Sequence, residues 1–223
     1  MEKVQTADGS TTFRSNSVDE TYHSTSGAKE ESLKKFVEPC LSLIKEKKEI
    51  TVLDVCFGLG YNTAALLDSV DENVKVNIIA LENDPEIILK VQDIDDNTFS
   101  KYEIIKELIK ENKEKIKKKE TISIDKDNIK ITLIIDDARK SITGIRDKFD
   151  LCFLDPFSPK KCPELWSYEF LNDIYEKMKD KSVLTTYSCA RVVRDNLKKA
   201  GFVVSNGPCV GRRAPSTIAR KGK

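Results

Sequence analysis

The chain has 223 residues, enough for one α/β domain with a full core and modest additions. Its 38 Lys and Arg are balanced by 37 Asp and Glu, so the net charge favours no class of partner. A single histidine, and six cysteines without a Cys-x-x-Cys pair, argue against a metal site and suit a reducing compartment. No apolar run reaches the roughly 18 residues of a membrane span. We therefore expect a cytoplasmic protein with no membrane partner and no metal.

The first part of the chain is polar. Residues 1–20 are rich in Ser, Thr, Asp and Gly, which predicts an extended or partly disordered, flexible lead-in. A single domain is expected over residues 21–223. Its first helix should run from about 28 to 44, because the apolar side chains in that range share one helical face.

A strand, a glycine turn and a helix follow one another over residues 50–67. The apolar run 50–55 is typical of a strand buried on both faces, and Asp54 lies at its end. Gly58 and Gly60 have no Cβ, which would let the turn approach a ligand closely. The pattern predicts a cofactor site at the carboxyl end of a parallel sheet. The alternative is an ordinary tight turn of an unrelated α/β protein.

The acidic residues around this turn indicate the kind of cofactor. The next strand, 76–81, ends in Glu82, whose carboxylate can accept hydrogen bonds from both hydroxyls of a ribose. Thr63 stands where the dinucleotide-binding pattern has its third glycine, and Asp54 would repel a pyrophosphate. Acidic groups suit S-adenosylmethionine instead, because it carries a sulfonium and an ammonium. We therefore predict S-adenosylmethionine as the cofactor.

Strands and helices alternate through the rest of the chain. Strands are expected at residues 129–135, 149–154, 182–187, 202–204 and 216–219, and helices at 85–94, 166–178 and 189–200. Residues 97–128 carry a further helical pattern, which we interpret as an insertion whose lysines are either solvated or in contact with phosphates. The alternation predicts a doubly wound, mostly parallel sheet with helices on both faces.

Four carboxylates terminate predicted strands: Asp54, Glu82, Asp137 and Asp155. Ligands of open α/β sheets lie at the carboxyl ends of the strands, so these groups are expected to surround one cleft. Asp137 lies where an adenine amino group would be bound. Asp155 precedes Pro156, which fixes the turn, and we predict that it holds an incoming amine and takes its proton. A structural Asp-Pro turn is the alternative.

The segment from Leu154 to Trp166 resembles the hallmark segment of the MnmC-like methyltransferases, and residues 185–213 and the stretch after Asp19 are similar as well. The resemblance implies a seven-stranded sheet of the class I S-adenosylmethionine-dependent methyltransferase type. It also implies N-methylation of the aminomethyl group on the wobble uridine of tRNA, with the anticodon region as partner. Cys56 departs from the family, in which many members have glycine there.

The resemblance also implies roles for individual residues. Asp155 falls on the catalytic aspartate. Gly58, Gly60, Glu82 and Asp137 fall on the cofactor contacts of the family. The full set of cofactor contacts expected is Asp54, Phe57, Gly58, Gly60, Asn62, Glu82, Asp137 and Asp155. The substrate contacts expected are Tyr22, Pro156, Phe157, Lys161, Trp166, Arg212 and Arg213. Trp166 would either stack on a base or pack in the core, and the basic carboxyl-terminal residues would either bind phosphates or be solvated.

Other functions remain open from the sequence. No oxidase domain is recognised, so an upstream modification enzyme would have to supply the aminomethyl group. A small-molecule amine transferase, either an aminopropyltransferase or a metabolite N-methyltransferase, would share the same fold. A non-catalytic RNA-binding subunit is a further alternative.

Overall fold

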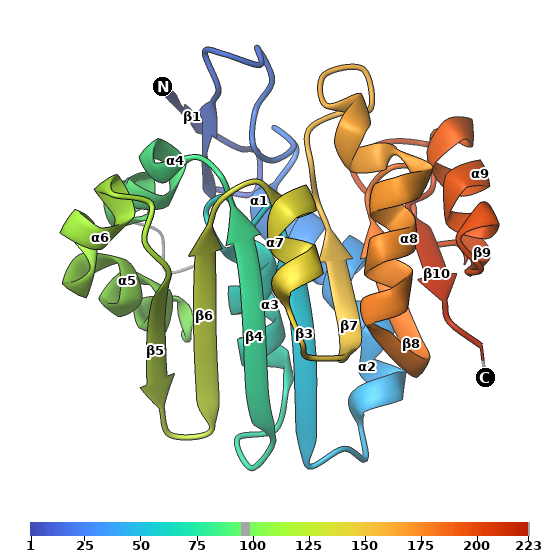
Figure 1. Ribbon diagram of the computed structural model, residues 1–223. Helices are drawn as coiled ribbons and strands as arrows, with labels where there is room; N and C mark the ends of the chain where they lie inside the picture. The colour runs from blue at the N-terminus through green and yellow to red at the C-terminus, as the bar shows by residue number, and fades with distance from the viewer. Residues whose placement is uncertain (95–98, 223) are drawn as a thin grey trace.

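The computed structural model describes residues 1–94 and 99–222. One sheet of eight strands runs through the molecule, in the order β5-β6-β4-β3-β7-β8-β10-β9 (Figure 1). Its strands are β3 (Glu49–Val55), β4 (Lys75–Glu82), β5 (Ile122–Lys126), β6 (Ile129–Ile135), β7 (Phe149–Leu154), β8 (Met178–Thr186), β9 (Val203–Asn206) and β10 (Thr217–Arg220).

The sheet is mostly parallel, as predicted. Strands β6, β4, β3, β7 and β8 run in the same direction, and β10 is antiparallel to both β8 and β9. The chain leaves β3 for β4 on one side and later returns to β7 on the other, so the order reverses beside β3. Ligands of doubly wound sheets bind at such a reversal.

The sheet has one strand more than the seven expected. Strand β5 pairs with β6 antiparallel and lies at the edge of the sheet. It belongs to the stretch interpreted as a helical insertion, where its short alternating sequence Ile-Ser-Ile-Asp-Lys was overlooked beside the stronger helical pattern.

Helices cover both faces of the sheet (Figure 1). The helical segments are α1 (Ala28–Glu31), the π-helical η1 (Ser32–Val37), α2 (Glu38–Ile44), α3 (Tyr61–Ser69), α4 (Pro85–Lys90), η2 (Val91–Asp93), α5 (Tyr102–Glu111), α6 (Lys113–Lys117), α7 (Ala138–Gly144), η3 (Pro163–Trp166), α8 (Tyr168–Lys177) and α9 (Arg191–Lys199). Among the described residues, no helix is both long enough and apolar enough to cross a membrane.

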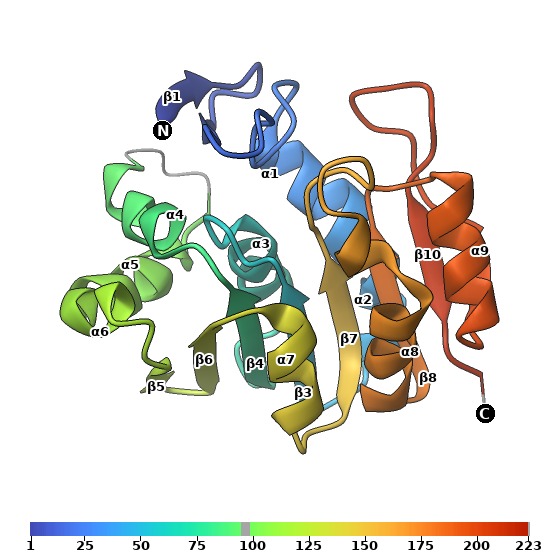
Figure 2. The ribbon, with the colours of Figure 1, turned by 45° about the horizontal axis from the view of Figure 1, so that its top comes forward.

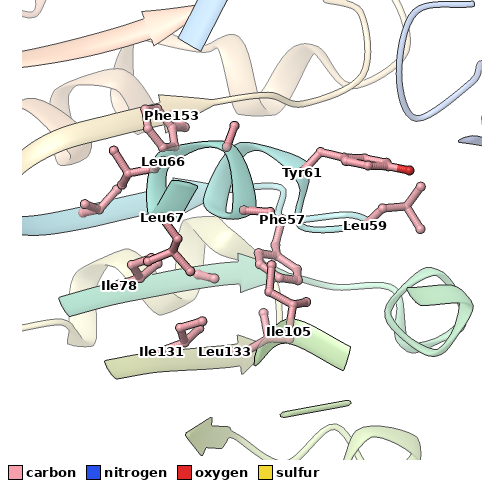
Figure 3. Packing of buried hydrophobic residues seen from close by; sticks show 14 of the residues in the cluster. Phe57, Leu59, Tyr61, Leu66, Leu67, Ile78, Ile105, Ile131, Leu133 and Phe153 are labelled. Carbon is pink, nitrogen blue, oxygen red and sulfur yellow. The ribbon is translucent and has the colours of Figure 1, made fainter. Parts of the chain in front are cut away.

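Successive residues of β3 point to opposite faces and belong to two separate apolar clusters. Val52 packs with side chains from α2, α3 and α5, whereas Leu53 packs with side chains from α7, α8 and α9. Figure 3 shows the first cluster, in which Leu67 of α3 lies against Ile78 of β4. Both clusters pack against the central strands, and the carboxyl ends of those strands carry the candidate site.

The predicted insertion over residues 97–128 is part of the core rather than an appendage. Helix α5 buries Ile105, Leu108 and Ile109, and Tyr102 donates a hydrogen bond to the Leu59 carbonyl at 2.7 Å. The Tyr102 ring also stacks on Tyr61, with centroids 5.5 Å apart. Residues 97 and 98 lie outside the described residues. The helical prediction is confirmed over α5, and its apolar face covers the edge of the sheet.

Residues 1–20 are not the flexible lead-in that their composition suggests. They form a hairpin of β1 (Glu2–Gln5) and β2 (Thr11–Arg14), which lies above the carboxyl ends of the strands (Figures 1 and 2). Phe13 is buried, and the Tyr61 hydroxyl donates to the Thr11 carbonyl at 2.9 Å. The polar residues misled the prediction because they satisfy one another, as when Asp8 accepts from Thr6 and Ser10.

Candidate active site

A cavity of about 1000 Å³ lies at the carboxyl ends of the central strands. Its walls come from segments that are far apart in the chain. They lie within residues 14–25, 56–58, 81–86, 136–139, 155–165 and 210–212, with further contributions from Glu31, Lys35, Lys119 and Tyr187. The hairpin, the strand ends and the loop after β7 therefore enclose one space.

Glu82 joins the end of β4 to the glycine turn. Its carboxylate accepts hydrogen bonds from the backbone N–H groups of Gly58, Asn83 and Asp84, at 2.8 to 3.0 Å. Burial raises the pKa of Glu82, and these three donors oppose that shift. The side chain is fixed at the cavity wall. Oε1 accepts two of these hydrogen bonds and Oε2 accepts one, so Oε2 keeps a lone pair for a ligand hydroxyl.

The turn after β3 requires left-handed backbone at three positions. Cys56, Gly58 and Gly60 have φ values of 64°, 52° and 80°. Cys56 is thus a non-glycine residue in a conformation that favours glycine, which explains the glycine of the family pattern but not its replacement by cysteine here. Gly58 lines the cavity. A Cβ on Gly60 would lie 2.5 Å from the Phe57 ring, so Gly60 serves packing rather than ligand approach.

Four of the predicted cofactor contacts lie behind the cavity wall. These are Asp54, Phe57, Gly60 and Asn62, none of which lines the cavity among the described residues. Asp54 is fully buried and accepts a hydrogen bond from the Thr63 hydroxyl at 2.7 Å. Burial raises the pKa of Asp54 to about 7. Asp54 and Phe57 lie on the strand and turn that support the site, so their side chains point into the protein.

Asp155 faces the cavity directly. It follows β7, and its backbone N–H donates to the Val55 carbonyl at 3.1 Å, which ties it to the adjacent strand. Asn62 donates from Nδ2 to Asp155 Oδ2 at 2.9 Å, so Asn62 orients the carboxylate from behind. Burial, and then the negative charge of Glu31, raise the pKa of Asp155 well above its usual value. Within the described residues no lysine or arginine forms an ion pair with it.

The loop after Asp155 is fixed by hydrogen bonds that its backbone carbonyl groups accept. The Tyr187 hydroxyl donates to the Pro156 carbonyl at 2.9 Å, and Trp166 Nε1 donates to the Phe157 carbonyl at 2.8 Å. Trp166 is buried, so it supports the loop and does not offer a face to a splayed base. The side chain of Glu20 accepts from both the N–H and the hydroxyl of Ser158, at 3.0 and 2.6 Å.

Tyr22 connects the hairpin side of the cavity to this loop. Its ring lies against Phe157, with centroids 4.9 Å apart, and its hydroxyl donates to Asp84 Oδ2 at 2.9 Å. Burial and the charges of Glu82 and Asp84 raise the pKa of Tyr22, which keeps the hydroxyl protonated. Tyr22 and Phe157 therefore form an aromatic wall beside Gly58.

The remaining predicted residues lie at the rim. Asp137 caps α7 by accepting from the Arg139 N–H at 2.9 Å, and its ion pair with the Arg139 guanidinium lowers its pKa. Lys161 and Arg212 line the cavity and are exposed. Arg213 is exposed as well but does not line the described cavity.

An ion pair inside the cavity was not among the predicted site residues. Glu31 Oε1 and Lys35 Nζ are 2.6 Å apart, and both side chains line the cavity while being largely buried. The helical pattern gave no signal, because an ordinary α-helix would place Lys35 opposite its apolar stripe; Lys35 is buried within the π-helical segment η1. A lysine on a buried face needs a partner, which the i, i+4 spacing to Glu31 supplies.

Residues 100–222 match a family model described as S-adenosyl-L-methionine-dependent methyltransferase. The crystal structure of MnmC2 from Aquifex aeolicus is similar at a TM-score of 0.81 and 35% identity, covering 98% of this chain and 69% of that one. The chain belongs to the MnmC-like family of S-adenosylmethionine-dependent methyltransferases. It is an enzyme, its methyl donor is S-adenosylmethionine, and the predicted fold class is confirmed.

Other relatives are longer proteins. An uncharacterized protein of Methanocaldococcus jannaschii is 37% identical over 98% of this chain, which spans 59% of that protein. The bifunctional MnmC protein of tRNA 5-methylaminomethyl-2-thiouridine biosynthesis from Campylobacter hominis is 29% identical over 74% of this chain and 25% of its own length. Spermidine synthase from Thermotoga maritima, at 14% identity and a TM-score of 0.58, shares the fold alone.

Proposed function

We propose that this methyltransferase acts on the amine of an aminomethyl group on the wobble uridine of tRNA, converting 5-aminomethyluridine into 5-methylaminomethyluridine. The observation that carries the proposal is Asp155, a half-buried carboxylate that faces the cavity without a cationic partner among the described residues. The names of the MnmC relatives support the substrate class.

The cavity suits the methyl donor. Gly58 leaves room for close approach, Glu82 Oε2 can accept from a ribose hydroxyl, and Tyr22 with Phe157 offers an aromatic wall. Asp137 lines the cavity at its rim, and we propose that its carboxylate, now paired with Arg139, would accept from an adenine amino group. When bound, S-adenosylmethionine supplies a methyl group that is already activated by its sulfonium leaving group.

The protein's contribution to the reaction is mainly the position and proton of the amine. Asp155 would hold the incoming aminomethyl group, oriented by the Asn62 amide. The amine nitrogen forms its bond to the methyl carbon as the carbon–sulfur bond breaks, and the surplus proton on nitrogen passes to Asp155. The raised pKa of Asp155 makes it a better proton acceptor than an exposed aspartate.

The rim provides cations for an RNA. Lys161 and Arg212 are exposed beside the cavity, and the Arg212 guanidinium lies over the Tyr187 ring at 5.9 Å. Arg194, in contrast, donates to Thr217, Asn206 and Ser216 and so holds the carboxyl-terminal strands together. We propose that the rim cations bind phosphates of the anticodon region, and that an upstream enzyme supplies the aminomethyl group.

The test is transfer of a labelled methyl group from S-adenosylmethionine to tRNA that carries 5-aminomethyluridine. Label should appear in 5-methylaminomethyluridine when the nucleosides are separated by mass spectrometry. Asp155→Asn protein and tRNA without the aminomethyl group serve as controls. Label in free amines, with none in tRNA, would instead support a metabolite N-methyltransferase and overturn the proposal.

A further inference from the structure

The Glu31–Lys35 ion pair lies in the same cavity as Asp155. Lys35 belongs to the π-helical segment η1, and its side chain is only 4% exposed; that of Glu31 is 12% exposed. Both charges contribute to the pKa of Asp155, Glu31 raising it and Lys35 lowering it. The pair is therefore near the reacting centre as well as inside the cavity.

The hydrogen bonds of this pair are incomplete on the lysine side. Glu31 Oε2 accepts from the Ser24 N–H at 2.9 Å and Oε1 from Lys35 Nζ, so both carboxylate oxygens are engaged. An ammonium has three donors. In the part of the chain that the structure describes, Glu31 is the hydrogen-bond partner of Lys35 Nζ, which leaves two N–H groups of a buried cation for a ligand.

His23 gives a second, independent sign of a ligand at this end of the cavity. Its side chain is buried and lines the cavity, yet Nδ1 has no hydrogen-bond partner among the described residues. The ring lies edge-on to Tyr61, with centroids 5.1 Å apart, and it is close enough to Glu31 for their charges to interact. A buried polar atom is rarely left without a partner.

An ion pair in a cavity complements a ligand that carries both charges. The methionine end of S-adenosylmethionine ends in an α-carboxylate and an α-ammonium. Burying a lysine is costly unless its charge is compensated. A carboxylate within reach of Lys35 Nζ would satisfy its open donors, and Glu31 would remain to attract the ammonium.

We propose that Lys35 binds the α-carboxylate of the methyl donor and that Glu31 attracts its α-ammonium, so that this pair selects S-adenosylmethionine over its decarboxylated form. An aminopropyltransferase uses the decarboxylated donor. That donor would leave the two Lys35 N–H groups unpaired, which is expensive inside a protein. The pair would thus restrict this fold to methyl transfer. The inference rests on the methyl donor and is independent of the tRNA substrate.

The test compares two ligands by calorimetry. S-adenosylhomocysteine has the methionine end, and 5′-methylthioadenosine lacks it. Lys35→Gln should weaken binding of S-adenosylhomocysteine by about 30-fold or more, as expected for a lost charge-assisted hydrogen bond. Binding of 5′-methylthioadenosine should change by less than about threefold. An equal loss for both ligands, or no loss for either, would overturn the proposal.

The neighbouring lysine is the matched control. Lys34 is exposed and pairs with Glu38 at 2.8 Å on the same helical segment, so Lys34→Gln should leave both affinities unchanged. Should Lys35→Gln fail to fold, the wild-type protein gives the same answer without a variant. It should bind S-adenosylhomocysteine at least about tenfold more tightly than S-adenosyl-3-thiopropylamine, which lacks only the carboxylate. Equal affinities would contradict the role of Lys35.

These measurements separate the two proposals. None of the ligands contains RNA, so a failure to methylate tRNA leaves the affinity ratios untouched. Conversely, transfer to tRNA by wild-type protein would stand even if Lys35→Gln bound both ligands normally.

Discussion

An aspartate lies at each end of strand β7, and the two carboxylates differ in how many hydrogen-bond and ion-pair partners they have. Asp150, near the amino end, is surrounded by donors and cations, whereas Asp155, just past the carboxyl end, has an amide from Asn62 and an open cavity. Burial acts on both carboxylates. Their partners decide that the pKa of Asp150 falls below its usual value while that of Asp155 rises.

The partners of Asp150 belong to several elements. Lys47 and Lys179 lie 2.5 and 2.8 Å from its oxygens, and Thr51 donates from both its N–H and its hydroxyl at 2.8 Å. This network joins β3, β7 and β8 near the amino ends of these strands, at the end of the sheet opposite the cavity. The comparison teaches that a fully partnered carboxylate stabilises the fold, whereas a poorly partnered one on the same strand is available for chemistry.

The largest expected effect separates activity from stability at Asp155. Asp155→Asn should lower kcat by about 10²- to 10⁴-fold, because the amide accepts no proton from the amine. Stability should change little, since burial already disfavours the charged form. Single-turnover methylation assays together with thermal unfolding would measure both. An Asp155→Asn protein that is active but unstable would show that Asp155 stabilises the fold and does not take part in the reaction.

Asp54 offers a buried carboxylate on the neighbouring strand to sharpen the comparison. Its pKa is raised to about 7 from an unfolded value near 4, so its contribution to stability is complete below about pH 4 and is lost as the pH rises toward 7. That loss amounts to about 4 kcal/mol at 1.36 kcal/mol per unit of pKa.

Asp54→Asn should therefore reduce the fall in the free energy of unfolding between pH 5 and pH 8. The asparagine remains neutral and can accept from the Thr63 hydroxyl as the acid does. Urea unfolding of the wild-type protein and the variant across this pH range gives the difference in their free energies of unfolding. The contributions of Glu82 and Asp155 cancel in this difference, because both proteins contain them. Parallel pH profiles would show that Asp54 does not titrate in the folded protein.

Removing the Asp150 carboxylate should affect stability but not ligand binding. Asp150→Ala should lower the free energy of unfolding by about 2 kcal/mol, since it leaves the half-buried Thr51 N–H and two lysines without their acceptor. The estimate is modest because both lysines are about two-fifths exposed and screened by water. Affinity for S-adenosylhomocysteine, measured below the unfolding temperature, should be unchanged. A large loss of that affinity would mean that the Asp150 network also supports the cavity at the other end of the strands.

The smallest effect concerns the individual cations. Lys47→Met and Lys179→Met should each cost less than about 1 kcal/mol, because the other lysine and Thr51 still compensate Asp150. The double variant should cost more than the sum of the two, since it removes the last cation beside a buried carboxylate. Urea unfolding of the four proteins forms a double-mutant cycle. Strict additivity would mean that the lysines act independently.

The sequence predicts the part of this molecule that depends on local pattern. The apolar run through Val55 and the glycine turn define the central strand and its helix, and strand-ending carboxylates predicted the position of the cavity. Glu82 and Asp155 both line it, as does Asp137 at the rim. These positions follow from the geometry of parallel sheets, in which every carboxyl end meets at the same edge.

The direction of individual side chains could not be predicted in the same way. Asp54 and Asp155 both sit near strand ends, yet only packing decides that one is enclosed and the other faces the cavity. The hairpin over residues 1–20 depends on distant contacts such as that of Tyr61 with Thr11. The role of Lys35 depends on its burial within the π-helical segment η1, which the helical pattern does not predict. Long-range packing supplies this information.

The contact between Glu20 and Ser158 joins segments that are 138 positions apart. Together with the Tyr22–Phe157 pair, this contact fastens the segment after the hairpin to the loop after β7; we call these two contacts the latch. A protease that cut within residues 14–25 would open this latch while the sheet beneath stayed intact. A ligand that touches both segments would hold the latch shut, so resistance of this stretch to proteolysis would report occupancy of the cavity.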